Sequence, residues 1–145
     1  MIAVDTNILV HAHRAGSPWH VRAVACLRQL AEGTMGWAIP WPCCHEFLAK
    51  VTHPRIFVSP SEPEEAFQFL SALTSSPHLS LLGEAPDHLA HLRRLAVAGR
   101  ITGARVHDAR IAAICTSHGV LELWTADRDF GRFPELKVRN PLVAD

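Results

Sequence analysis

Four acidic residues stand where an apolar run ends or a helix begins, and these are Asp5, Glu46, Asp108 and Asp127. Two carboxylates about 4 Å apart repel by roughly 4 kcal/mol at an effective dielectric constant near 20, so a cluster of four needs protons or divalent cations. Oxygen ligands without cysteine or histidine at zinc spacing favour Mg²⁺ or Mn²⁺. Such ions activate water and stabilise both oxygens of an in-line displacement at phosphorus. The chemistry that this set predicts is metal-dependent phosphodiester hydrolysis.

Asp5 ends the apolar run of residues 2–4, whose composition suits a strand covered on both faces. Thr6 and Asn7 then open an amphipathic segment, which places the carboxylate at the C-terminal end of a strand where a helix begins. In an open parallel sheet, ligands bind at that edge. The alternative is that Asp5 or Asn7 only caps the helix.

Asp108 lies near the start of a helix predicted over residues 106–118. It shares a face with Ile111, Ala112 and Cys115, so the acid stands at one end of the buried stripe. Burying an unpaired carboxylate is costly, which favours a functional role. The alternative is an acid in the first turn that interacts favourably with the helix dipole.

Glu46 and Asp127 also stand close to the ends of predicted strands. Glu46 falls in the first turns of a helix predicted from residue 43 to residue 52, where an exposed place on the polar face is the alternative. Asp127 comes three residues after a strand predicted at 120–124. If these strands are parallel neighbours, all four acids converge on one edge of the sheet.

Strands and helices alternate along the whole chain. Strands are predicted at residues 2–4, 35–39, 79–82, 120–124 and 137–139, and helices follow Asp5 and occupy residues 17–33, 43–52, 61–73, 86–99 and 106–118. Helix starts are indicated by Ser17-Pro18 and by a capping box from Ser61 to Glu64, and a helix end by Gly119. The predicted fold is an α/β three-layer sandwich with a mainly parallel central sheet and right-handed crossovers.

Length and composition predict one domain spanning residues 1–145, because 145 residues of which 48% are hydrophobic suit a single core. The formal charge is zero, from 14 basic and 14 acidic residues, which excludes an overall basic field. Any binding of a polyanion must therefore be local. The cations near the predicted site in sequence are Arg14, Arg105, Arg110, Arg128 and Arg132.

The N-terminus and the lengths of the apolar runs predict a cytoplasmic protein with no membrane partner. The N-terminus lacks the basic region of a signal peptide, and no apolar run approaches the length of a membrane span. The 4 cysteines lie in apolar patterns without metal-ligand spacing and are predicted to be buried free thiols. The 4 Trp and 6 Phe residues are expected in the core or at interfaces, so no RNA-contacting residue is assigned.

Several short motifs follow one another in order along the chain. They are Val4-Asp5-Thr6-Asn7, the helix-borne Glu46, His107-Asp108-Ala109, and Leu-Trp-Thr-Ala-Asp-Arg-Asp-Phe at residues 123–130. Together they resemble the successive motifs of the PIN domain, specifically those of the VapC ribonuclease toxins of toxin–antitoxin pairs. The resemblance runs from residue 2 to about residue 140.

This resemblance implies that Asp5, Glu46, Asp108 and Asp127 form a catalytic acidic pocket that binds Mg²⁺ or Mn²⁺. Thr125 and Thr6 match the hydroxyl residues beside such a site, and Asp129 matches a second acid whose participation differs among families. The resemblance also implies an RNA substrate, a small VapB-like antitoxin bound to the chain, and a homodimer.

Two other functions compete with the endoribonuclease. One is a phosphatase or receiver-like domain with Asp5 as phosphate acceptor, but residue 7 is Asn rather than the second acid of a D-x-D motif. The other is a catalytically silent partner-binding or RNA-binding module, against which the presence of all four acids argues. Crowded carboxylates predict that Asp5→Asn or Asp108→Asn lowers activity steeply and keeps or raises metal-free stability. Simple helix caps predict little change in either property.

Overall fold

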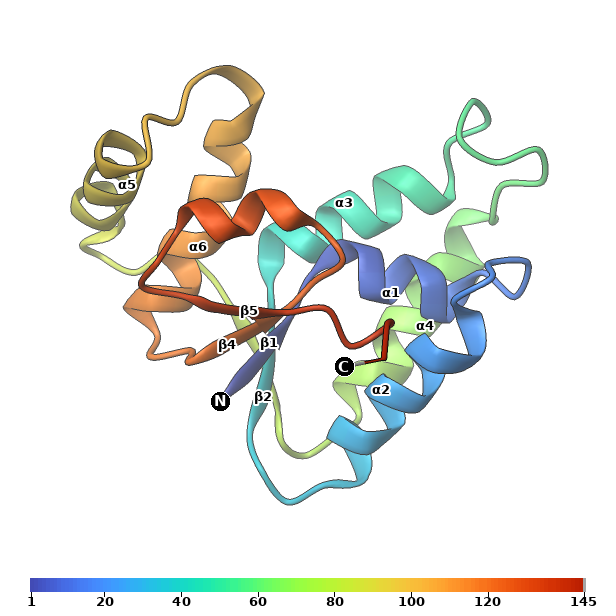
Figure 1. The fold of residues 1–145 in the computed structure, drawn as a ribbon. Coiled ribbons are helices and arrows are strands. Elements are labelled where there is room, and N and C mark those ends of the chain that lie inside the picture. Colours follow the sequence, from blue (N-terminus) through green and yellow to red (C-terminus); the bar gives the residue numbers. More distant parts are fainter. Residues whose placement is uncertain (145) are drawn as a thin grey trace.

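The computed structural model describes residues 1–144 as a five-stranded sheet with helices on both faces (Figure 1). The strands are β1 (Ile2–Val4), β2 (Trp37–Pro40), β3 (Leu79–Leu82), β4 (Glu122–Trp124) and β5 (Lys137–Arg139). The α-helices are α1 (Thr6–His13), α2 (His20–Glu32), α3 (Trp41–Val51), α4 (Pro63–Thr74), α5 (His88–Ala98) and α6 (Val106–Ser117). Two 3₁₀-helices are η1 (Gly103–Arg105) and η2 (Arg128–Arg132).

The strand order is β3-β2-β1-β4-β5, and every neighbouring pair is parallel. From β1 the chain moves outward through β2 to β3, then α5 and α6 carry it back to β4 on the other side of β1. Figure 1 shows α5 and α6 on one side of the sheet and α1, α2 and α4 on the other. The predicted three-layer α/β sandwich is confirmed. The direction in which the chain adds strands to the sheet reverses between β1 and β4, because β2 and β3 lie on one side of β1 and β4 and β5 on the other. Ligands bind at such switch points, outside the carboxyl ends of the strands.

The central elements are apolar on nearly all sides because both faces of the sheet are covered. All four residues of β2 are buried, as are Ala3 and Val4 of β1. Residues 111–115 of α6 are buried without interruption, so this helix is an interior element. Its first turn, which carries Asp108, is thereby anchored to the core.

Some predicted boundaries were wrong by two or three residues. Helix α2 begins at His20 rather than at 17, because Ser17 and Pro18 form a turn in which the Ser17 carbonyl accepts from the His20 N–H at 3.1 Å. Strand β2 begins at Trp37 rather than at 35, and α5 begins at His88 rather than at 86. These shifts leave the order and type of the elements unchanged.

The predicted capping box at Ser61 is wrong. The residue before α4 is Glu62, and no side chain caps that helix. The Ser61 hydroxyl instead contacts His13 Nε2 at 2.8 Å and accepts from Arg14 Nη1 at 3.2 Å, while Arg14 Nη2 donates to the Ser59 carbonyl at 2.7 Å. Arg14 therefore holds the segment before α4, and these contacts lie at the end of α1 away from Asp5.

The 4 cysteines are free and buried, as predicted. Within residues 1–144 no helix is both long enough and apolar enough to cross a membrane.

Candidate active site

Asp5 lies buried at the carboxyl end of β1, where four groups donate hydrogen bonds to its carboxylate. Oδ1 accepts from the Thr6 backbone N–H at 2.7 Å and from the Cys43 thiol at 3.4 Å. Oδ2 accepts from the Thr125 hydroxyl at 2.7 Å and from the Asn7 side-chain amide at 3.2 Å. Burial raises the pKa of Asp5, although the hydrogen bonds from Thr125, Thr6 and Cys43 act in the opposite direction. Asp5 does cap α1, but the cap is one of four contacts that fix this carboxylate.

Thr125 and Asn7 join the ends of β1 and β4 beside Asp5. While it donates to Asp5, the Thr125 hydroxyl accepts from Asn7 Nδ2 and from the Asp127 N–H, both at 3.0 Å. Asn7 Oδ1 accepts in turn from the Ala126 N–H at 3.0 Å. Asn7 was considered only as a helix cap in the sequence. Its position two residues after Asp5 gave no signal of this, because residues two apart on a helix do not share a face, and only the contacts to Asp5 and Thr125 reveal its place.

Glu46 reaches the same edge of the sheet from α3. Because α3 follows β2 without a loop, Glu46 lies early in a helix that starts beside the end of β1. The Thr6 hydroxyl donates to Glu46 Oε2 at 2.7 Å. The structure therefore brings Asp5 and Glu46 together through Thr6.

Asp108, Asp127 and Asp129 each place one carboxylate oxygen within 4.8 Å of the others. Asp127 precedes η2, and its Oδ1 accepts from the Asp129 N–H at 2.8 Å, which holds both acids on one turn. Asp108 approaches them from the first turn of α6. From the sequence, Asp129 was only a secondary candidate for the site, whereas the structure places it in this cluster.

The charges of the other four acids act on Asp108. Burial raises the pKa of Asp108 to about 6, and the negative charges of Asp127, Asp5, Glu46 and Asp129 contribute to the increase. The four acids predicted from the sequence thus meet at the carboxyl edge of the sheet, around the switch point between β1 and β4.

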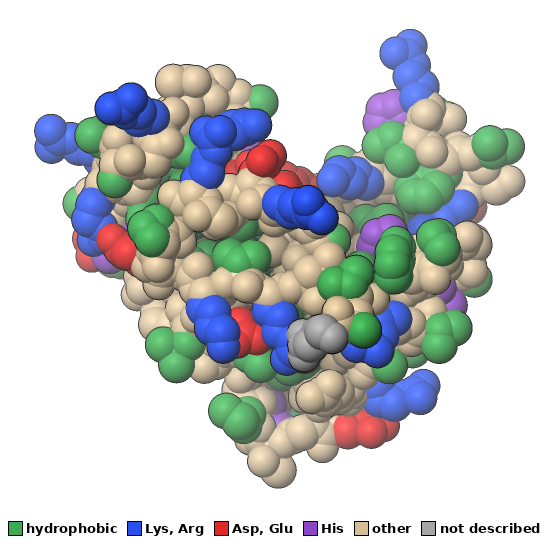
Figure 2. Space-filling view, viewed as in Figure 1, with side chains coloured by type: hydrophobic (Ala, Val, Ile, Leu, Met, Phe, Trp, Pro, Cys, Tyr) green, Lys and Arg blue, Asp and Glu red, His purple; other side chains and the backbone are tan. Residues whose placement is uncertain are grey.

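Cations surround the acidic group at the surface. Figure 2 shows acidic side chains in a hollow with Lys and Arg side chains around it. Arg105 Nη2 lies 3.8 Å from Asp129 Oδ2, and Arg110 is paired with Glu84 through Nη2 at 2.5 Å. Arg128 and Arg132 are exposed on η2. A local basic rim therefore exists despite the neutral overall charge.

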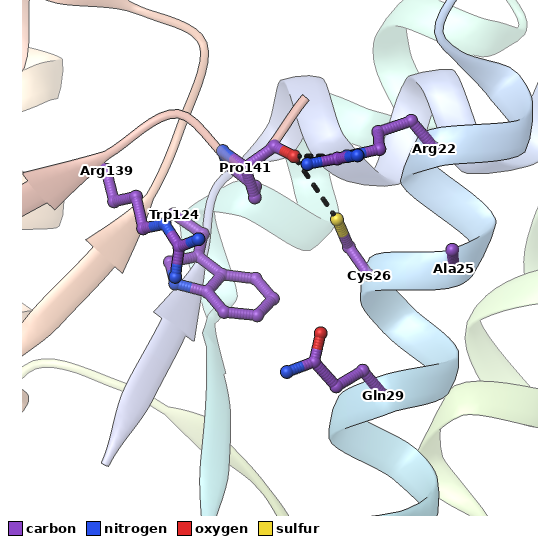
Figure 3. Close-up of a pocket in the computed structure, with 7 residues that line it drawn as sticks. All are labelled: Arg22, Ala25, Cys26, Gln29, Trp124, Arg139 and Pro141. Atoms are coloured by element: carbon purple, nitrogen blue, oxygen red, sulfur yellow. Dashed lines mark hydrogen bonds between the residues drawn. The ribbon is translucent and has the colours of Figure 1, made fainter. Parts of the chain in front are cut away.

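A second hollow, of about 300 Å³, lies between α2 and the strands β4 and β5 (Figure 3). Arg22 Nε donates to the Pro141 carbonyl at 2.9 Å, and the Cys26 thiol donates to the same oxygen at 3.7 Å. The Arg139 guanidinium lies over the Trp124 ring, 5.9 Å from its centroid. Since these contacts tie the segment after β5 to α2, we assign this hollow a structural role.

The donor set of the acidic group fits a hard divalent cation. All candidate ligands are carboxylate oxygens, and the raised pKa of Asp108 reflects its burial first and then a repulsion from the other acids that a cation would offset. Cys43 is no competing ligand, because burial raises the pKa of its thiol well above the ordinary value and the thiol donates to Asp5.

Known proteins resemble this chain along most of its length. The PIN domain family model matches residues 2–136. Ribonuclease VapC48 of Mycobacterium tuberculosis is 34% identical over 138 residues, which are 95% of each chain. The structure of VapBC2 from Rickettsia felis, bound to a DNA fragment from its promoter, has a TM-score of 0.71 at 21% identity and covers 97% of this chain and 98% of that one.

A further solved structure is VapC20 of Mycobacterium tuberculosis, described as a sarcin–ricin loop cleaving toxin. It has a TM-score of 0.66 at 17% identity and covers 90% of this chain and 93% of that one. At such identities these two structures support the fold. The family-model match and the 34% identical relative also identify the family. The chain belongs to the PIN domain family, among the VapC ribonucleases.

Proposed function

We propose that this chain is a metal-dependent endoribonuclease, the toxin of a VapBC-type toxin–antitoxin pair, which hydrolyses phosphodiester bonds of RNA. The observation that carries the proposal is the gathering of acids at the carboxyl ends of β1 and β4, where Thr6 joins Asp5 to Glu46 and where Asp108, Asp127 and Asp129 lie within 4.8 Å of one another. The ribonuclease names of relatives at 34% identity support RNA as the substrate. We propose residues 1–145 as a single domain, which one continuous hydrophobic core supports.

We propose Asp5, Glu46, Asp108 and Asp127 as the catalytic metal-binding residues, with Asp129 as a further ligand, for Mg²⁺ or Mn²⁺. When bound, such an ion makes water more acidic and offsets negative charge at the phosphate. The chain's own contribution is positional. Hydrogen bonds fix the Asp5 carboxylate from four sides, and the pKa of Asp108, about 6, means that a cation competes with a proton for this group in mildly acidic solution.

The test is incubation of the purified protein with a mixed RNA pool in Mg²⁺, in Mn²⁺ or in excess chelator, followed by mapping of the cut ends. We expect cleavage with metal and none with chelator. The Asp108→Asn variant, purified in the same way, controls for contaminating nuclease. Full activity in chelator would exclude the metal mechanism, and no cleavage under any condition would favour the catalytically silent module.

We also propose a small VapB-like antitoxin as partner, a homodimer as assembly, and the cytoplasm as the compartment in which the RNA is cut. Solved VapBC complexes of the same fold support the partner. Co-expression with the product of a short neighbouring reading frame is expected to give a co-purifying complex that does not cleave RNA. Separate elution with unchanged activity would contradict the antitoxin, and light scattering of the free protein would test the dimer.

A further inference from the structure

Trp41 and His45 form an aromatic surface at the start of α3 that the acidic group does not explain. Their rings stack with centroids 6.0 Å apart and planes inclined by 27°. Trp41 is 44% exposed, whereas Trp37 and Trp124 are buried in the core. An exposed indole whose orientation is fixed by a neighbouring ring is suited to receive another flat ring.

One member of the pair, His45, lines a cavity of about 250 Å³ that reaches the acidic group, while both rings also line an apolar cavity between α3 and α4. The walls of the first cavity are Pro42, His45 and Glu46 from α3 and His107 and Arg110 from α6. Glu46 is one of the acids that act on Asp108, and His107 directly precedes Asp108. This first cavity therefore opens beside the place where the proposed function puts the scissile phosphate.

The loop after β3 pairs with the cation of this region and passes close to the indole. Arg110 donates to Glu84 through Nε at 2.6 Å and is paired with it through Nη2 at 2.5 Å. Trp41 lies over the preceding residue, Gly83, since an added Cβ there would come within 3.8 Å of Trp41 Cδ1. A guanidinium and an imidazole are donors suited to phosphate oxygens, and stacked aromatic rings are suited to unpaired bases.

We propose that this cavity and the Trp41–His45 pair form a nucleotide subsite for single-stranded RNA, with a base on the aromatic pair and a phosphate beside His107 and Arg110. The inference rests on the proposed function, because it orients the RNA relative to the acids. The favoured substrate is single-stranded, since base pairing hides the faces that stack. A protein partner would need no phosphate donors, so the combination of donors and rings favours RNA.

The first measurement is binding of a fluorescently labelled, mixed-sequence single-stranded RNA by anisotropy, in chelator and low salt so that the RNA stays intact. We expect Trp41→Ala to weaken binding by about 5- to 150-fold, the range for loss of one stacked base. His107→Ala is expected to weaken binding as well, through loss of a donor to the phosphate. Trp41→Phe is expected to keep most of the affinity. The matched control is Trp19→Ala, because Trp19 is 40% exposed in the turn before α2 and is expected to bind RNA like wild type.

The second measurement is the rate of RNA cleavage in Mg²⁺ or Mn²⁺, where we expect the two alanine variants to raise KM more than they lower kcat. Melting curves confirm that each variant is folded. If Trp41→Ala and His107→Ala bind RNA as well as Trp19→Ala does, the subsite is overturned. If Trp41→Ala loses binding of the antitoxin but keeps binding of RNA, the subsite is also overturned, and the surface belongs to the protein partner. A wild type that cleaves no RNA would overturn the proposed function, whereas the binding measurement would still decide the subsite.

Discussion

Asp5 and Asp108 are both members of the acidic group, but Asp5 is buried and accepts four hydrogen bonds, whereas Asp108 is only half-buried. The Thr125 hydroxyl already accepts two hydrogen bonds, from Asn7 and from the Asp127 N–H, so its proton is directed to Asp5. An amide at residue 5 would turn an N–H₂ toward Thr125 and Asn7 with no acceptor there, and an unsatisfied buried group costs about 1–3 kcal/mol. The expectation of equal effects for the two Asp→Asn changes is therefore revised for Asp5.

We expect metal-free Asp108→Asn to be as stable as wild type or more stable by about 1 kcal/mol after solvent screening, because the change relieves repulsion. Asp5→Asn is expected to melt lower than Asp108→Asn, at about 3 °C per kcal/mol. Both variants should lose RNA cleavage. Melting curves in chelator beside a cleavage assay test this, and equal melting temperatures would show that the hydrogen bonds to Asp5 matter less than its charge.

The stability of the metal-free protein should depend on pH through Asp108. Its pKa of about 6 in the folded chain lies above the ordinary value of 3.8, so the folded state holds the proton more tightly. The destabilising effect of this acid is fully present above about pH 6 and is lost as the pH falls toward about 4. We expect the melting-temperature gap between Asp108→Asn and wild type to shrink from about pH 7.5 to about pH 5. A gap that widens on acidification would contradict the assignment.

At the scale of single residues, the sequence predicted which acids meet but not how they are held. Asp5, Glu46, Asp108 and Asp127 were visible because acids that follow buried strands, or begin buried helices, are unusual. The contact from Cys43 to Asp5 was not visible, because a thiol in an apolar helix pattern looks the same whether or not it donates to a carboxylate. Asp129 could be placed only when η2 was known to hold it against Asp127.

The secondary-structure elements show why some termination signals are reliable and others are not. Gly119 was predicted to end α6, and it adopts φ of 73°, a conformation that glycine enters without strain. Ser61 was predicted to cap α4, but a serine hydroxyl has several possible partners and here contacts His13 and Arg14. A backbone requirement is local to the sequence, whereas the choice of a side-chain partner depends on the tertiary fold.

Gly119→Ala is expected to lower the free energy of unfolding by about 1 kcal/mol, because an L residue is strained at positive φ. A Cβ at residue 119 would meet no atom within 4 Å, so the whole effect would come from the backbone. Gly16→Ala is the matched control, since its Cβ would also meet open space and its φ is not positive. Urea unfolding of both variants measures the difference, and equal midpoints would contradict the strain argument.

At the scale of the whole molecule, the sheet order is what turns separated motifs into one site. The sequence predicted parallel strands but could not order them, because the pattern of a βα unit does not say on which side of β1 its strand pairs. The return of the chain through α5 and α6 puts β4 next to β1, and this brings Asp127 beside Asp5. A chain that continued outward from β3 would have carried the same residues with the acids dispersed along the edge.

That convergence predicts a specific response of the folded chain to metal. A ligand that binds the folded state alone stabilises it by mass action, by about 2.7 kcal/mol at a hundredfold excess over Kd, which corresponds to roughly 5–10 °C in melting temperature. We expect Mg²⁺ or Mn²⁺ to raise the melting temperature of wild type in a saturable way and to raise that of Asp108→Asn much less.

Asp87→Asn provides a matched control for the chemical change, because Asp87 lies exposed at the start of α5, paired with His91. Its response should equal that of wild type, and NaCl at matched ionic strength should separate specific binding from the screening of surface charges. If Asp108→Asn shows the same saturable rise as wild type and Asp87→Asn, the cation binds elsewhere and Asp108 does not hold it.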